Sequence, residues 1–329
     1  MLNPIKMNEP HKQHATPDAK HKKPKENSNF LSIFPTFDSD TKFLLKSCLL
    51  SKLFMLFVCF WLNNPVADKN EDRWHFQANY NRGKYGFADG VSFMLNWDGH
   101  YFFNTILRGY DNIKQYAFYP GFPMFVRYLN LIVTNLIPGL SSYLEKEQLQ
   151  YLFIICIGFV MNMCLHVMNT LMFAKLASLK GLPKYQCTRI ALFFTLSGPT
   201  LFHITLYSES LYLFLTLFGL IALETYVYRP ESRPVDEIRF SQFLTIILPL
   251  AASAFVRSVG TLSFAYIGYP LLIEAIQKYL KTKKISAAAP SVLRILLALV
   301  LFITPTVFLF LRTRYLYCRS EERRVGKEC

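Results

Sequence analysis

The acidic residue Asp98 lies in a run of aromatic residues that suits it for proton transfer. The run, residues 96–102, reads NWDGHYF. Aromatic neighbours desolvate a carboxylate and raise its pKa, and such a carboxylate can act as a general base on a sugar hydroxyl. The alternative is that Asp98 caps a helix that begins at Gly99. Trp97 and His100 are candidate ligand contacts beside the acid, although Trp97 also fits an interfacial aromatic belt and a lone histidine is more often structural.

A second polar group, Tyr207-Ser208-Glu209-Ser210, lies between two apolar runs. A carboxylate that faces lipid is costly, so we expect Glu209 to face the bundle interior, a cavity or water. The alternative is a solvated acid at a helix start, where the helix dipole favours it. Tyr207 and Glu209 are therefore candidate binding residues.

Three further candidates lie outside these two groups. Arg257 interrupts the apolar stretch Leu248–Phe264, and its guanidinium can either bind a phosphate or extend to the lipid headgroups. His203, which follows a Ser-Gly-Pro break, is likewise either a ligand contact or structural. Tyr119 lies in residues 117–123, AFYPGFP, where two prolines around a glycine predict a rigid turn.

Motifs of nucleotide and metal chemistry are absent from the sequence. There is no GxGxxG, P-loop or HExxH motif. The seven cysteines include no CxxC pair, which indicates neither a zinc site nor a disulfide framework. We therefore expect no metal and no cofactor. The net charge of +14 comes mostly from short loops and an N-terminal tail, so nucleic acid is not an expected partner.

The elements that must position these residues are membrane helices. Charged residues make up 18% of the chain, whereas a soluble domain carries about 25%. The apolar residues are grouped in runs of about 20, the length that crosses the hydrocarbon core as a helix. We predict an all-α, polytopic transmembrane bundle with spans at residues 43–62, 151–176, 189–207, 208–228, 240–256, 260–277 and 292–311.

Loop charge predicts the orientation of this bundle. Residues 1–42 form a lysine-rich tail that we expect to be disordered and cytosolic. Residues 63–150 then form a large loop on the far side, and residues 151–318 form the multi-span region. Within the loop, residues 122–140 are predicted as an interfacial helix, because only then do the basic loops fall on the cytosolic side. The candidate residues then gather at the non-cytosolic face.

Two smaller predictions concern the ends of the chain. Lys46 and Lys52, near the start of the first span, are expected to extend their amines to the headgroups. Residues 319–329, RSEERRVGKEC, resemble the translation of a sequencing-adapter oligonucleotide, so we exclude them from the fold. We expect the natural chain to continue beyond Cys318, which makes this sequence C-terminally truncated.

Together these motifs resemble the GPI mannosyltransferase 2 family. The resembling stretches are NWDGHYFFNTILRGY (96–110), AFYPGFP (117–123), GPTLFHITLYSESLY (198–212) and AFVRSVG (254–260), in the family's order. The family's Trp-Asp pair falls on Trp97 and Asp98. The sequence departs from the family by having Asn96 where an arginine is usual.

The resemblance implies a type C glycosyltransferase fold with a large first lumenal loop in the endoplasmic reticulum membrane. The donor would be dolichyl-phosphate mannose, and the acceptor the GPI precursor, which gains its second mannose through an α-1,6 bond. Asp98 would act as the general base of an inverting reaction. Arg257, helped by His203, would stabilise the leaving phosphate, and Glu209 would orient sugar hydroxyls or the arginine. A small membrane subunit is a candidate partner.

Two other classes of function compete with this interpretation. Glu209 and Arg257 inside a membrane bundle also suit a secondary transporter, although the chain lacks a repeated pair of broken helices. A non-catalytic membrane subunit that only scaffolds an enzyme complex is the other alternative.

Overall fold

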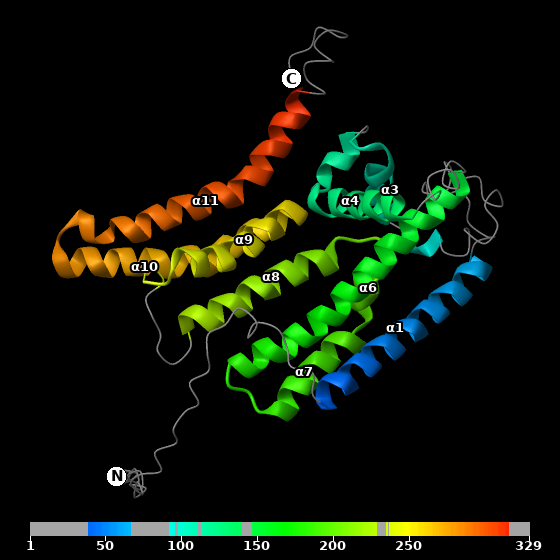
Figure 1. Ribbon diagram of the computed structural model, residues 1–329, viewed down its shortest axis with the longest axis horizontal. Helices are drawn as coiled ribbons and strands as arrows, with labels where there is room; N and C mark the ends of the chain where they lie inside the picture. The colour runs from blue at the N-terminus through cyan, green and yellow to red at the C-terminus, as the bar shows by residue number, and fades with distance from the viewer. Residues whose placement is uncertain are drawn as a thin grey trace, which may run out of the picture.

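The computed structural model describes residues 39–66, 92–95, 98–110, 113–137, 139, 147–228, 235 and 237–315. Over these residues the chain is helical, with no β-strand. The α-helices are α1 (Ser39–Val66), α3 (Asp98–Arg108), α4 (Gly121–Leu136), α6 (Glu147–Leu179), α7 (Lys184–Leu196), α8 (Glu209–Leu223), α9 (Phe240–Val256), α10 (Phe264–Thr282) and α11 (Ile285–Thr313). They are joined by the 3-10 helices η2 (Ser92–Leu95), η3 (Ile113–Ala117), η4 (Gly198–His203) and η6 (Ser258–Ser263), and the π-helical turn η5 (Glu224–Tyr228) extends α8. In Figure 1, α3 and α4 lie together near the start of α6, close to the end of α9.

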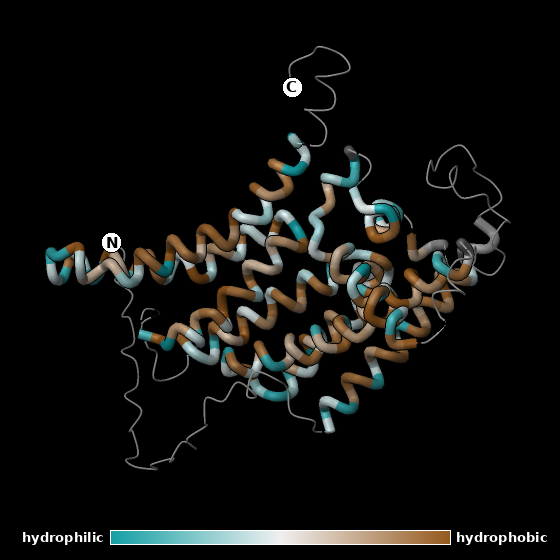
Figure 2. Tube along the Cα trace, turned by 45° about the horizontal axis from the view of Figure 1, so that its top comes forward, coloured by the Kyte–Doolittle hydropathy of each residue, from teal (hydrophilic) through white to brown (hydrophobic). Residues whose placement is uncertain are grey.

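Within the described ranges, five helices are long and apolar enough to cross a membrane. They cover Ser39–Trp61, Leu149–Leu179, Glu209–Tyr228, Ser258–Thr282 and Ile285–Thr313. Figure 2 shows hydrophobic residues along these helices. The prediction of an all-α, polytopic helical bundle is confirmed. Helix α9 has the predicted bounds, but its 17 residues rise only about 26 Å, slightly less than the hydrocarbon thickness.

The predicted span at residues 189–207 is not one continuous helix. Helix α7 ends at Leu196, and the chain passes through Ser197 into η4. The sequence Gly198-Pro199 explains the break, because proline has no N–H for an α-helix and glycine is a weak helix former. Residues 204–208 are also non-helical and lead into α8. This break creates the segment that carries Tyr207.

The N-terminal boundary of the bundle also differs from the prediction. Residues 1–38 of the predicted tail lie outside the described residues, but residues 39–42 belong to the first turn of α1. Ser39 and Asp40 are residue types that stabilise the start of a helix, and Asp40 carries the negative charge that the helix dipole favours there. The helix therefore begins before its apolar run.

Helix α4 occupies most of the predicted interfacial segment 122–140. Its buried side chains, Phe122, Pro123 and Val126, are confined to its first two turns. Gly121 makes a close approach possible, since a Cβ there would lie 2.7 Å from the carbonyl oxygen of Phe255. Helix α4 thus begins against the end of α9. Its position at the membrane interface stays a prediction.

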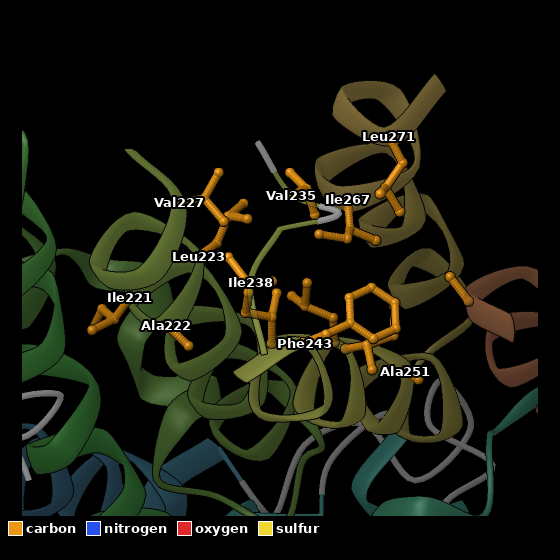
Figure 3. Packing of buried hydrophobic residues seen from close by; sticks show 14 of the residues in the cluster. Ile221, Ala222, Leu223, Val227, Val235, Ile238, Phe243, Ala251, Ile267 and Leu271 are labelled. Carbon is orange, nitrogen blue, oxygen red and sulfur yellow. The ribbon is translucent and has the colours of Figure 1, made fainter. Parts of the chain in front are cut away.

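Two apolar clusters hold the helices together. The first joins α8, α9, α10 and α11 around the fully buried Phe243 (Figure 3). Gly219 lets α8 and α9 approach, because a Cβ at this position would lie 2.5 Å from Cγ of Leu250. Close packing of this kind drives helix association in lipid, where water exclusion contributes little. The second cluster joins α3, α4 and the start of α6 around Phe103 and Phe122.

The prediction that Lys52 extends to the headgroups was wrong. Its side chain is fully buried, and its Nζ donates a hydrogen bond to the carbonyl oxygen of Thr195, 2.7 Å away. Helix α7 ends at Leu196, so a carbonyl in its last turn can accept a hydrogen bond from a donor outside the helix. Lys52 supplies that donor and joins α1 to the end of α7. Lys46 is exposed, and the extension of its amine to the headgroups stays a prediction.

Candidate active site

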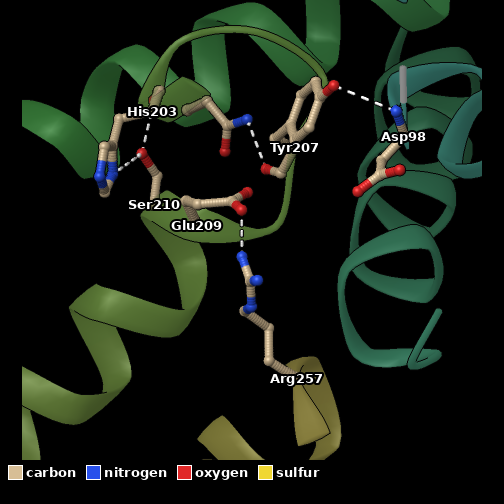
Figure 4. Close-up of polar contacts among 7 residues, drawn as sticks. Asp98, His203, Tyr207, Glu209, Ser210 and Arg257 are labelled. Carbon is tan, nitrogen blue, oxygen red and sulfur yellow. Dashed lines mark hydrogen bonds and ion pairs between the residues drawn. The ribbon is translucent and has the colours of Figure 1, made fainter. Parts of the chain in front are cut away.

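Three charged side chains from distant parts of the chain gather in one region (Figure 4). Asp98 is the first residue of α3, Glu209 is the first residue of α8, and Arg257 directly follows α9. Residues 204–208, between η4 and α8, bring Tyr207 into the same region. Helix termini therefore supply all three charges.

Asp98 is the first residue of α3, and its role as a general base stays a prediction. It lies in the first turn of α3, where a negative charge suits the helix dipole, and its side chain is solvent-accessible. Partial burial nevertheless raises the pKa of Asp98, and the positive charge of Arg257 opposes part of that rise. Gly99 keeps the helix start tightly packed, because a Cβ there would lie 2.9 Å from the carbonyl oxygen of Met94. A carboxylate with a raised pKa at an accessible position is suited to accept a proton.

Glu209 and Arg257 form an ion pair, in which Nη1 of the arginine donates to Oε1 of the glutamate. Their side chains are 27% and 37% exposed, so the pair is reachable from outside the protein. The arginine completes the end of α9 with its backbone N–H, which donates to the carbonyl oxygen of Ser253 at 3.0 Å. Glu209 therefore contacts the arginine, and its predicted role in orienting the arginine or sugar hydroxyls stays a prediction.

Tyr207 links the acid to the segment before α8. Its phenol oxygen accepts a hydrogen bond from the backbone N–H of Asp98, at 3.1 Å. Burial raises the pKa of Tyr207 to about 12, so the phenol stays neutral at physiological pH. The ring also packs edge-on against Phe102 of α3, with centroids 6.3 Å apart. Tyr207 therefore holds the start of α3 in place.

His203 has a packed environment rather than a contact with the arginine. Its ring lies against His166 and Phe194, with centroids 5.7 and 5.4 Å apart. Its Nδ1 lies 3.3 Å from Oγ of Ser210, and that hydroxyl donates to the His203 carbonyl oxygen. In Figure 4, His203 and Arg257 lie on opposite sides of Ser210 and Glu209. The predicted help of His203 to Arg257 stays a prediction.

The remaining candidates have partners of their own. His100 lies 2.8 Å from the amide nitrogen of Asn104 through its Nε2, and burial lowers the pKa of its imidazole. The hydroxyl of Tyr119 lies 3.1 Å from Oγ1 of Thr306 and so joins its turn to α11. Trp97 lies outside the described residues.

Two asparagines on α6 contact this region and were missed by the sequence analysis. Nδ2 of Asn162 donates to the carbonyl oxygens of Thr205 and Tyr207, and Nδ2 of Asn169 donates to that of Ser210. Both side chains are fully buried. Their signal in the sequence was a pair of amides seven residues apart in a mostly apolar span, a spacing that places them on one helix face.

In the part of the chain that the structure describes, no group of three or more His, Cys, Asp or Glu side chains is placed to hold a metal ion. The charged groups of the site are two carboxylates and one guanidinium, of which one carboxylate and the guanidinium are already paired. Such a set can accept a proton and bind an anion. The expectation that no metal is used stays a prediction.

Comparison with known proteins identifies the family. A sequence model described as mannosyltransferase (PIG-V) matches residues 85–328. GPI mannosyltransferase 2 of Drosophila melanogaster is 24% identical over 248 residues, which cover 74% of this chain and 50% of that protein. The chain therefore spans about half the length of this relative. No solved structure gives a significant match. Because the family match covers most of the sequence, including Asp98, Glu209 and Arg257, this chain belongs to the mannosyltransferase (PIG-V) family.

Proposed function

We propose that this chain carries the catalytic region of a membrane mannosyltransferase of GPI-anchor synthesis. The enzyme transfers mannose from dolichyl-phosphate mannose to the GPI precursor, as the second mannose and through an α-1,6 bond, at the lumenal face of the endoplasmic reticulum. The observation that carries this proposal is Asp98, an accessible carboxylate with a raised pKa in the same small region as the Glu209–Arg257 ion pair. The family and the name of the relative support the reaction class.

In the proposed reaction Asp98 is the general base. It removes the proton from the acceptor hydroxyl as that oxygen attacks the anomeric carbon of mannose. The bond from the anomeric carbon to the phosphate oxygen breaks, and dolichyl phosphate leaves from the opposite face. The configuration at the carbon is therefore inverted. The accessible position of Asp98 at the start of α3 lets the acceptor hydroxyl approach it.

Arg257 is the group that stabilises the leaving phosphate. The phosphodiester of the donor carries one negative charge, and the departing monophosphate gains a second. A guanidinium interacts more strongly with the second state than with the first, so it lowers the barrier to bond breaking. Glu209 holds the guanidinium through one nitrogen, Nη1, which leaves the rest of the group to face the phosphate.

The expected substrates and protein partners follow from this proposed reaction. Both substrates are lipids, which is consistent with charged groups that lie at the ends of apolar helices. We further propose that the N-terminus is cytosolic and that a small membrane subunit assists the enzyme. Nucleic acid and a metal ion have no place in this scheme.

The Asp98→Asn variant tests the catalytic role. Asparagine caps a helix as well as aspartate does, so the substitution preserves the start of α3 and removes the base. Expressed in the full-length protein, it is expected to abolish the restoration of GPI-anchored proteins at the surface of cells that lack GPI mannosyltransferase 2. Immunoblotting is expected to show unchanged protein abundance.

The matched control is Asp40→Asn, which alters another aspartate in the first turn of a helix, α1, remote in sequence from the site. It is expected to restore surface proteins fully. Full restoration by Asp98→Asn would reject the catalytic assignment and favour the scaffold role. Solute transport by the reconstituted protein without mannosyl transfer would favour the transporter.

A further inference from the structure

The segment between η4 and α8 is buried without being helical. Ile204, Leu206 and Tyr207 are 0%, 1% and 6% exposed. A buried backbone outside regular structure needs hydrogen-bond partners from elsewhere, above all in a membrane protein. The N–H groups of Ile204, Thr205 and Tyr207 donate to the nearby carbonyl oxygens of Leu201 and Thr205, and the further partners come from α6 and from Met94.

One amide on α6 binds two carbonyl groups of this segment. The two N–H bonds of the Asn162 Nδ2 reach the carbonyl oxygens of Thr205 and Tyr207, the second at 3.0 Å. Both partners are acceptors, so the nitrogen of the amide must face them. No other side chain of this size combines two donors on one neutral atom; aspartate has none when ionised, and serine has one.

The neighbouring positions on α6 fit the same segment. Gly158, one turn before Asn162, contacts the Leu206 side chain so closely that a Cβ would overlap it. Asn169, two turns after Asn162, binds the carbonyl oxygen of Ser210 at 3.0 Å. These three positions lie on one face of the helix. This face of α6 therefore complements the segment both by close apolar packing and by hydrogen bonds to its carbonyl groups.

The same segment connects to both halves of the candidate site. The phenol oxygen of Tyr207 accepts a hydrogen bond from the backbone N–H of Asp98 at 3.1 Å. The N–H of Leu206 donates to the carbonyl oxygen of Met94 at 3.3 Å, just before α3. Glu209, two residues beyond Tyr207, binds Arg257. The position of Tyr207 therefore sets where Asp98 lies relative to the ion pair.

We propose that Asn162 is a positioning residue for mannosyl transfer, which acts by holding the 205–207 segment so that Asp98 and the Glu209–Arg257 pair face one substrate. This role rests on the proposed function. Asn162 does not touch the reacting atoms, and it acts through the Tyr207 backbone and ring.

The test uses purified full-length protein with labelled dolichyl-phosphate mannose and a GPI precursor acceptor. Asn162→Asp keeps the size of the side chain and replaces both donors with an acceptor. Since a misplacement of about 1 Å can cost a factor of about 100, we expect kcat to fall about 100-fold. The KM of each substrate is expected to stay within about twofold of wild type, because donor and acceptor contacts are not removed. Asn162→Gln, which retains both donors, is expected to recover part of the loss.

The matched control is Thr216→Val on α8, which removes a buried side-chain hydrogen bond of 2.9 Å to the carbonyl oxygen of Tyr212 without touching the segment. It is expected to keep the wild-type kcat. A wild-type kcat in Asn162→Asp, or a loss no larger than that of the control, overturns the proposal. So does a change confined to KM.

The folding of the variants is part of the test. If Asn162→Asp does not accumulate, Asn162→Ser, with one donor and less volume, is judged by the same criteria. Failure of both to accumulate beside a normal control would overturn positioning in favour of a purely structural role. Absence of transfer by the wild-type protein would reject the proposed function itself, whereas an unaffected Asn162→Asp variant would reject the positioning role alone.

Discussion

Asp98, Glu209 and Arg257 form a set of charges that suits the transfer step at the residue scale. In the proposed reaction Asp98 loses its negative charge when it accepts the proton, and the leaving phosphate gains one. The total charge beside Arg257 is therefore unchanged while the negative charge moves. The negative charge of Glu209 offsets part of the positive charge of Arg257. Without this offset, the guanidinium would lower the pKa of Asp98 further and make the carboxylate a weaker base.

The pH dependence of transfer follows from the same charges. The rate is expected to fall on acidification as Asp98 gains a proton, and at a higher pH than an ordinary aspartate would require, because its pKa is raised. The groups near it are Arg257, Glu209 and Tyr207 from neighbouring elements and His100 on α3. Glu209→Gln removes a negative charge, so the acidic limb of the kcat profile is expected to move to lower pH. Arg257→Gln is expected to move it to higher pH.

These shifts are measured on normalised profiles, since both variants also reduce the absolute rate. Glu224→Gln is the control, because Glu224 follows the last residue of α8 and pairs with Lys180. Its profile is expected to match that of the wild type. Shifts of the same sign in the two site variants would contradict the assignment of Asp98 as the titrating base.

Helix ends are the features that build the site at the element scale. Asp98 and Glu209 begin α3 and α8, where backbone N–H groups favour a negative charge. Arg257 follows the end of α9, where backbone carbonyls favour a positive charge. Each charge therefore fits the dipole of its own helix, and the ion pair forms between the start of α8 and the end of α9, against which α4 begins. The close approach of α4 to α9 at Gly121 fixes this meeting point.

Gly121 offers a test of that meeting point. A Cβ at Gly121 would lie 2.7 Å from the Phe255 carbonyl oxygen and 2.9 Å from Cγ2 of Val256. Because backbone and packed side chains must move to admit it, Gly121→Ala is expected to lower stability by about 1–3 kcal/mol. Thermal unfolding in detergent measures this change. Gly198→Ala is the control, since a Cβ there meets nothing within 4 Å. Equal unfolding temperatures in the two variants would contradict the close packing.

At the scale of the whole molecule, the arrangement of the helices gathers the site from three separate parts of the chain. Asp98, Glu209 and Arg257 lie in one small region, although long apolar helices separate them along the chain (Figures 1 and 4). Loop charge predicts that this region faces away from the cytosol. Lipid substrates can reach such a site from the membrane surface.

Glycosylation tags test this orientation directly. A tag near residue 90 is expected to be modified by the lumenal glycosylation machinery, and a tag near residue 282, between α10 and α11, is expected to stay unmodified. Gel mobility before and after deglycosylation reports the result. The opposite pattern would reverse the proposed topology and place Asp98 in the cytosol, where it could not act on a lumenal acceptor.

The amino-acid sequence by itself determined the class of fold and the candidate residues. Apolar runs long enough to cross a membrane are local features, so most helices follow the predicted spans, and α9 has the same bounds. The break at residues 197–208 was only partly visible. Gly198-Pro199 signalled it, but the apolar residues that follow resemble a continuing span. The acid, the arginine and the tyrosine were each found from their unusual surroundings.

Only the tertiary structure decided which of these residues meet. Glu209 and Arg257 are 48 positions apart and become partners because α8 and α9 pack side by side. Lys52 is buried because its amine donates a hydrogen bond to the carbonyl oxygen of Thr195 at the end of α7. Asn162 binds two carbonyls of a segment more than 40 residues away. Hydropathy is a property of one stretch of chain, whereas these contacts need two stretches in contact, and for that reason they appear only in the folded molecule.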